Sequence, residues 1–160
     1  MIVVSDTTPI SEIAKIGRLT LLRDVYQRVI IPQEVYDEVM AGPGSIPAAM
    51  RSVSWIEVLT VSDANKMLAL HLSTRLGLGE CAAITLAEEM GSERLLIDDR
   101  AGRREAMARG LPVTGTIGTL LVAKQLGIIA NVRDVLDDLR AHGTRISEGL
   151  YRDALAAASE

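Results

Sequence analysis

The stretch Leu95-Leu96-Ile97-Asp98-Asp99-Arg100 decides how this 160-residue chain folds, because a short apolar run ends there in two adjacent carboxylates. Segments with helical spacing flank the run on both sides, which is typical of a buried strand in a parallel sheet. In open α/β sheets, ligands bind just beyond the carboxyl ends of such strands. Asp98 and Asp99 are therefore expected at a functional edge of the sheet.

The N-terminus of the chain repeats this arrangement. The apolar run Ile2-Val3-Val4-Ser5 leads directly into Asp6. Thr7-Thr8-Pro9 then supplies a cap and a first-turn proline, both typical of a helix that begins here. Because the carboxyl ends of parallel strands meet at one edge of a sheet, we expect Asp6 on the same edge as Asp98 and Asp99.

Strands and helices alternate through the rest of the chain. Further strands are predicted at Val29–Pro32, Trp55–Leu59 and Gly110–Thr114, and segments with helical spacing separate them. Ala41–Pro47 is rich in glycine and proline and is predicted as a turn. Alternation of this kind implies right-handed crossovers and a mainly parallel sheet covered on both faces. We therefore predict an α/β fold, a three-layer α/β/α sandwich with additional C-terminal helices.

Length and composition favour a single domain over residues 1–160, because a hydrophobic fraction of 48% supplies a core for a chain of this size. No apolar run reaches the roughly 18 residues of a membrane span, and Met1–Val4 lacks the basic start of a signal peptide. A cytoplasmic protein without membrane association is expected. Cys81 is the only cysteine, and His71 and His142 lie far apart. Zinc-ligand spacing is therefore missing, and any metal would be bound by oxygen.

The charge balance argues against binding of nucleic acid by bulk electrostatics. The chain carries 17 basic and 21 acidic residues, a net charge of −4, whereas such binding depends on neutralising phosphates. Phe is absent, and one Trp and three Tyr leave too few aromatic faces for a base-stacking platform. A pure RNA-binding module is excluded, but a local basic patch is not.

Acidic side chains are the main candidates for chemistry at the shared edge. Three follow strands, one opens the helix before Leu95, and one lies on the helix after the second strand: Asp6, Asp98, Asp99, Glu80 and Glu38. Two carboxylates about 4 Å apart repel by roughly 4 kcal/mol at an effective dielectric near 20, so several ionised together need cations or protons. An oxygen-only cluster favours Mg²⁺ or Mn²⁺, which would activate water against a phosphodiester.

Each of these acids also has a purely structural interpretation. Asp99 would serve as the N-cap of the helix that begins at Arg100, and Glu80 at a helix start favours the helix dipole. Glu38 is an ordinary exposed helix residue by pattern. Three acids that arrive at one edge are harder to explain as caps, so both interpretations stay open for the individual residues.

Three arginines begin the helix after Asp99. Arg100, Arg103 and Arg104 oppose the helix dipole there, and a phosphate-bearing substrate would explain them. The alternative is a solvated basic face balanced by Glu105 and the two aspartates. Thr116, in Gly115-Thr116-Ile117-Gly118, opens another helix at the same edge and is either a contact for phosphate or a plain N-cap.

The segment Gly77-Leu78-Gly79-Glu80-Cys81-Ala82 matches a dinucleotide-binding pattern. However, the residues before it indicate helix and loop instead of a strand, and Glu80 would place negative charge where a pyrophosphate must bind. We therefore exclude nucleotide binding. Cys81, His71 and His142 are interpreted as packing or surface residues, because none has a partner in the sequence that would activate it.

In this order the motifs resemble the PIN-domain family, in the branch of VapC-type toxin ribonucleases. The matching pieces lie within about residues 1–126, and residues 127–160 form a helical extension: Ser5-Asp6-Thr7-Thr8-Pro9, Ile30-Ile31-Pro32 with Val35 and Glu38, Gly77-Leu78-Gly79-Glu80, Leu96-Ile97-Asp98-Asp99-Arg100 and Gly115-Thr116-Ile117-Gly118 before Leu120. The resemblance implies a PIN-like sandwich, a Mg²⁺- or Mn²⁺-dependent RNA-cleaving site, a homodimer and an antitoxin partner.

By position, the resemblance also implies roles for individual residues. The resemblance assigns metal binding to Asp6, to Glu80 and to one or both of the adjacent aspartates Asp98 and Asp99. Glu38 corresponds to a further acid, and Thr116 to a polar residue near the metal. Thr7 and the three arginines are expected to contact substrate.

Two departures from the family pattern matter. Ala82 stands where relatives often carry another acid, and two aspartates compete for one position. The last thirty or so residues lie outside the resemblance and are candidates for a dimer or partner surface. The rival hypothesis is a catalytically silent, partner-binding protein of the same fold, whose acids only cap helices. A phosphoacceptor receiver domain would need its paired acids after the first strand, the reverse of the order found here.

Overall fold

The computed structural model covers residues 1–160 and contains a five-stranded sheet in which every neighbouring pair is parallel. Its spatial order is β3-β2-β1-β4-β5. The strands are β1 (Val3–Ser5), β2 (Val29–Pro32), β3 (Ile56–Leu59), β4 (Arg94–Leu96) and β5 (Val113–Thr114). Because strands buried on both faces must be apolar throughout, the short runs of Val, Ile and Leu in the sequence form the central strands.

The strand order reverses between β1 and β4. From β1 the chain moves outward to β2 and β3 on one side, and β4 continues to β5 on the other. Ser5 pairs with Leu96, and the Asp6 amide donates a 2.8 Å hydrogen bond to the Leu96 carbonyl. The carboxyl ends of β1 and β4 thus lie side by side at the switch point, where α/β sheets form a ligand crevice.

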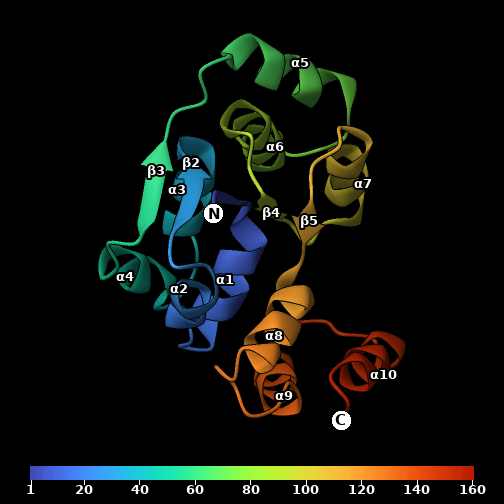
Figure 1. The fold of residues 1–160 in the computed structure, drawn as a ribbon. Helices are drawn as coiled ribbons and strands as arrows, with labels where there is room; N and C mark the ends of the chain where they lie inside the picture. The colour runs from blue at the N-terminus through green and yellow to red at the C-terminus, as the bar shows by residue number, and fades with distance from the viewer.

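Helices pack around the sheet as a three-layer α/β/α sandwich (Figure 1). They are α1 (Thr7–Lys15), α2 (Thr20–Tyr26), α3 (Gln33–Met40), α4 (Ile46–Arg51), α5 (Ala64–Ser73), α6 (Leu78–Met90), α7 (Arg100–Ala108), α8 (Thr116–Gln125), α9 (Arg133–Ala141) and α10 (Glu148–Ala157). The predicted fold class is confirmed. None of these helices is long and apolar enough to span a membrane.

Helix α6 forms the centre of the helical packing. It contacts β1, β2 and β4, and every residue from Cys81 to Ala87 is buried. Alanines at positions 82, 83 and 87 let the helix approach the sheet closely, and apolar residues on all sides are typical of a buried helix. Since Glu80 lies in the first turn of this fixed helix, the packing of α6 also sets the position of that carboxylate.

The C-terminal helices lie beside α8, at the opposite end of the molecule from α5 (Figure 1). Helix α9 buries Val135, Leu136 and Leu139 in the core. The Glu160 carboxylate accepts hydrogen bonds from the Val132 and Arg133 amides, so it caps the start of α9. The division into a core of residues 1–126 and an extension of residues 127–160 stays a prediction.

Helix α4 was not predicted. The turn expected at Ala41–Pro47 ends at Ile46, and Pro47 lies in the first turn of α4. A proline is well tolerated there because its missing amide hydrogen has no acceptor in the helix. The helix buries Ile46 and Met50, so the proline that indicated a turn in fact begins a helix.

Candidate metal centre

Asp6 is the most enclosed acid of the predicted site. It follows β1 directly, its side chain is 3% exposed, and it occupies the N-cap position of α1 without accepting a capping hydrogen bond. The backbone bond from Asp6 to Leu96 fixes its position at the switch point. A buried carboxylate that does not cap its own helix has unused capacity to bind a cation.

Other acids surround Asp6. Burial raises the pKa of Asp6 to about 7, the Thr7 amide opposes this rise, and the charges of Glu80, Glu38 and Asp98 add to it. Acids from four segments of the chain therefore act on one another at the carboxyl edge of the sheet. Asp6 thus lies within electrostatic reach of three of the predicted acids, and their joint role as a metal site stays a prediction.

Glu80 extends from the first turn of α6 toward the same region. Burial raises its pKa, as do the charges of Asp99 and Glu38, and the Gly77 amide lowers it. One Glu80 oxygen accepts a 3.3 Å hydrogen bond from that amide. Glu80 thus stabilises its own helix start, as one sequence interpretation held, while it also adds charge to the cluster.

Glu38 reaches the cluster from α3. Its carboxylate accepts a 2.5 Å hydrogen bond from the Thr7 hydroxyl. A Cβ atom on Gly79 would lie 2.5 Å from Glu38 Oε1, far inside van der Waals contact. Gly79 therefore leaves room for the Glu38 carboxylate in its present position, and a larger residue there would displace that carboxylate. The sequence did not indicate this role, because there Gly79 is only one member of the dinucleotide-like pattern and of the family motif around Glu80.

Asp98 joins the end of β4 to the start of α8. Its two oxygens accept hydrogen bonds from the Thr116 amide at 2.7 Å and the Thr116 hydroxyl at 2.6 Å. Gly115 is the N-cap residue of α8, so the interpretation of Thr116 as the cap is wrong. A Cβ on Gly115 would lie 2.7 Å from Asp98 Oδ1, which makes Gly115 a second glycine that leaves room for a carboxylate.

Asp99 is more exposed than Asp98 and caps α7, because its Oδ2 accepts a 2.7 Å hydrogen bond from the Gly102 amide. The predicted cap is confirmed. Asp98 acts electrostatically on Asp6, whereas Asp99 acts on Glu80. Each member of the adjacent pair therefore faces a different acid, and both stay candidates for the same ligand position.

The three arginines of α7 differ in how they are held. The Arg103 guanidinium donates a 3.0 Å hydrogen bond to the Ile97 carbonyl and is partly buried. Arg100 and Arg104 are exposed and form no ion pair. Glu105 was expected to balance this face, but it pairs with Arg109 instead. Exposed cations without partners thus lie next to the acidic cluster.

A family model described as PIN domain matches residues 2–160. The chain belongs to the PIN-domain family. PIN domains are generally nucleases, so membership supports a hydrolase acting on nucleic acid, of the kind that typically uses divalent metal ions. Comparisons with curated proteins and with solved structures found no significant match.

The acids of this PIN domain fit a hard divalent cation by their chemistry. All the donors are oxygens, and none of the five acids is paired with a lysine or arginine. As placed, no three Asp, Glu, His or Cys side chains surround one point as metal ligands. Mg²⁺ is commonly bound through one or two carboxylates and several waters, so two acids suffice. Asp6 and Glu80 are the two acids of the site whose pKa values are raised, so a bound cation would stabilise their ionised forms.

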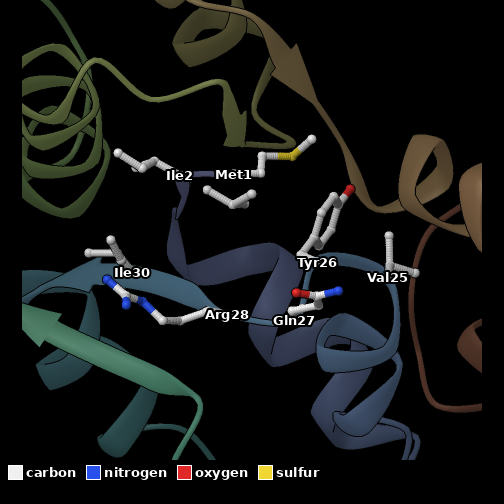
Figure 2. Close-up of a pocket in the computed structure, with 8 residues that line it drawn as sticks. Met1, Ile2, Val25, Tyr26, Gln27, Arg28 and Ile30 are labelled. Atoms are coloured by element: carbon white, nitrogen blue, oxygen red, sulfur yellow. The ribbon is translucent and has the colours of Figure 1, made fainter.

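The largest cavity of the PIN domain lies elsewhere. It has a volume of about 600 Å³ and lies at the amino ends of β1 and β2, where Met1, Tyr26 and Arg28 line it (Figure 2). No carboxylate lines this cavity. It therefore contributes nothing to a metal centre, and the candidate site stays at the opposite end of the strands.

The remaining reactive side chains of the PIN domain have structural roles. Cys81 is fully buried in α6. A ring nitrogen of His71 lies 2.9 Å from the Leu76 carbonyl, and one of His142 lies 2.8 Å from the Asp138 carbonyl. The sequence interpretation of these three residues as packing or surface groups is confirmed.

Proposed function

We propose that this PIN domain is a metal-dependent endoribonuclease and the toxin of a toxin–antitoxin pair. A single observation carries the proposal: Asp6 is buried without a cationic partner while the charges of Glu80, Glu38 and Asp98 act on it. Such an arrangement is unfavourable for ionised carboxylates unless a divalent cation joins them. Membership of a nuclease family adds that the substrate is nucleic acid.

Each side chain of the candidate site has its own role in the proposed reaction. Asp6 and Glu80 would hold Mg²⁺ or Mn²⁺, with Asp98 or Asp99 as a further ligand. When bound, such an ion supplies positive charge for the phosphate oxygens and lowers the pKa of water. Thr7 orients Glu38 through its hydroxyl, and Thr116 orients Asp98. Arg100 and Arg104 would attract the phosphates of the substrate.

Cleavage of structured RNA with and without Mg²⁺ tests the proposal. The wild-type protein should cleave RNA only with the divalent ion, and the double variant Asp6→Asn, Glu80→Gln should not cleave at all. Because both changes keep the size of the side chains, circular dichroism should show an unchanged fold. Divalent-dependent cleavage retained by the double variant would refute the assignment of these two acids.

The silent partner-binding alternative has support from one observation: Asp99 and Glu80 do accept hydrogen bonds at the starts of their helices. Calorimetric titration with Mn²⁺ separates the two functions. A ribonuclease should bind the ion saturably, with loss of binding in Asp6→Asn, whereas a silent protein should show no saturable heat.

The toxin role, the antitoxin, the homodimer and the cytoplasmic location come from the resemblance and the composition. The cheapest test of the toxin role is the neighbouring reading frame, where a short gene for a DNA-binding antitoxin is expected directly upstream. Co-expression of that gene should relieve growth arrest caused by this protein. Light scattering of the purified chain should give twice the monomer mass if the homodimer is correct.

A further inference from the structure

Three neighbouring cavities share Asp98 as a lining residue. The first, of about 290 Å³, lies along α7 beside Arg100 and Arg104. The second, of about 450 Å³, shares Asp98 and Arg103 with it. The third, of about 500 Å³, shares Asp98, Ile117 and Leu150 with the second and ends at the segment 143–146 between α9 and α10. We call these three cavities together the Asp98 groove.

Cations without partners lie at both ends of the Asp98 groove. Arg100 and Arg104 line it at α7, and Arg145 lines it at the segment between α9 and α10. None of these three pairs with a carboxylate, although eight other cations of the chain form ion pairs. Since these three arginines line the cavities beside Asp98 and are not neutralised by an acid, their charges are free to bind an external anion there.

The segment that carries Arg145 is fixed on both sides of the arginine. Thr144 donates its hydroxyl to the Glu12 carboxylate on α1 and its amide to the Leu139 carbonyl at 2.9 Å. Beyond Arg145, the Arg140 guanidinium donates to the Ile146 carbonyl at 2.9 Å. The anchored backbone keeps the base of the Arg145 side chain at the edge of the groove, so only the side chain itself has to be ordered when it binds a ligand.

We propose that the Asp98 groove holds a single strand of RNA past Asp98, a candidate ligand of the metal centre, with Arg145 binding a backbone phosphate on the far side of Asp98 from Arg100 and Arg104. This inference rests on the proposed ribonuclease function and extends it by naming the path of the substrate. No Phe, Trp or Tyr lines the groove, so affinity comes from the phosphates and depends strongly on salt. A strand held on both sides of the acids is cut internally.

The test compares two exposed arginines, one that lines the Asp98 groove and one that does not. Arg145→Gln and Arg152→Gln remove the same charge from exposed side chains, but Arg152 on α10 lines none of the three cavities. Both are made with Asp6→Asn in the background so that the strand stays intact, and binding of a fluorescent single-stranded RNA is measured by anisotropy with Mg²⁺. Thermal melting checks the fold of each variant.

We expect Arg145→Gln to weaken binding about 5-fold and to lower the slope of log affinity against log salt by about 0.7, the value for one phosphate contact on a single strand. Arg152→Gln should change neither quantity. Arg145→Lys should recover most of the affinity, since a phosphate contact tolerates a point charge. Equal effects of the two glutamine variants would overturn the proposal.

Cleavage assays keep this inference separate from the proposed function. Normal RNA cleavage by Arg145→Gln, together with unchanged binding, would refute the groove and leave the ribonuclease intact. Weakened RNA binding by Arg145→Gln in a protein that cleaves no RNA would support the groove and refute the ribonuclease. A wild-type protein that binds no single-stranded RNA would refute both.

Discussion

The acids at the carboxyl edge of the sheet fall into two groups that are held in different ways. Asp6 and Glu80 have raised pKa values, and burial is the largest cause in both. Asp98 and Asp99 accept short hydrogen bonds from the starts of α8 and α7. The first group is therefore destabilised by its own charge, whereas the second is stabilised by backbone and hydroxyl donors.

The two groups of acids contribute differently to a metal site: one fixes its shape and the other gives it affinity for a cation. Hydrogen-bonded carboxylates give the site its shape, because their positions are fixed before any ion arrives. Carboxylates with raised pKa values, the buried Asp6 and the half-buried Glu80, give it affinity for a cation, because a bound ion relieves their repulsion. Variants of the first group should therefore change activity and the pH dependence of stability, and variants of the second group that remove a hydrogen-bond acceptor should lower stability.

The largest expected effect is the loss of cleavage in Asp6→Asn. Removal of an outer-shell partner of a metal ligand already costs about 10 to 100-fold, so removal of a central ligand should cost more than about 100-fold. The rate of RNA cleavage in saturating Mg²⁺ measures the effect. Asp24→Asn, at a surface position on α2 where Asp24 pairs with Arg23, is the control and should cleave normally. Comparable cleavage rates for both variants would show that Asp6 is not a ligand of the catalytic metal.

The second effect is the dependence of stability on pH. Since the pKa of Asp6 is raised from 3.8 to about 7, the unfolded chain releases this proton at lower pH than the folded protein does. Stability should then fall as pH rises from about 4 to about 7, by up to about 4 kcal/mol, and stay low above that range. Glu80 should add to the fall in the same direction, because its pKa is also raised.

Urea unfolding at pH 5 and pH 8 in EDTA measures this dependence. Asp6→Asn should reduce the difference between the two pH values and be more stable than wild type at pH 8. Added Mg²⁺ should restore the stability of the wild type at pH 8 but not that of the variant, because bound ligand stabilises only the protein that binds it. If the free energy of unfolding of the wild type were the same at pH 5 and pH 8, Asp6 and Glu80 would not have the raised pKa values described here.

The third effect concerns Gly79→Ala. The new methyl group would occupy the position of the Glu38 carboxylate, which lies at the end of a flexible side chain and therefore moves away. We expect the free energy of unfolding to stay within about 1 kcal/mol of wild type, since alanine favours the helix by about that amount. Cleavage should fall about 10-fold as the Glu38 contact with Thr7 is lost.

Gly149→Ala is the matched control for this change. Gly149 lies in the first turn of α10, and nothing lies within 4 Å of the position of its Cβ. This variant should gain a little stability and keep full activity. If Gly79→Ala also keeps full activity, Glu38 takes no part in the site.

The fold was predictable from local patterns because each element carries its own signal. Short apolar runs gave the strands, and the acids that follow them were expected to converge because every strand is parallel. Helix α4 was missed since its proline is equally typical of a turn. Local pattern alone does not distinguish a proline within a turn from one that begins a helix.

The detailed geometry of the site was less predictable, because it depends on pairs of elements that meet only in the folded chain. Gly79 leaves room for the carboxylate of Glu38, which lies on a different helix, and Gly115 leaves room for that of Asp98. The sequence pattern at these helix starts did not indicate which side chain lies against each glycine. In the same way, the pairing of Glu105 with Arg109 instead of the first-turn arginines depends on side-chain positions.

The smallest expected effect separates charge from capping at Asp99. Asp99→Ala loses the hydrogen bond to the Gly102 amide and should lower the free energy of unfolding by about 1 kcal/mol, as at other N-caps. Asp99→Asn keeps the cap and removes only the charge, so its stability should stay near that of wild type. Asp63→Ala provides the control, because Asp63 caps α5 by accepting a hydrogen bond from the Lys66 amide and is not one of the five acids of the candidate site.

Chemical denaturation and cleavage assays on these three variants give a clear decision. Asp63→Ala and Asp99→Ala should lose similar stability, and Asp63→Ala should keep its activity. Since the charge of Asp99 acts on Glu80, we expect Asp99→Asn to lose activity without losing stability. Full activity in Asp99→Asn would reduce Asp99 to a helix cap and leave Asp98 as the carboxylate that joins Asp6 and Glu80 at the metal.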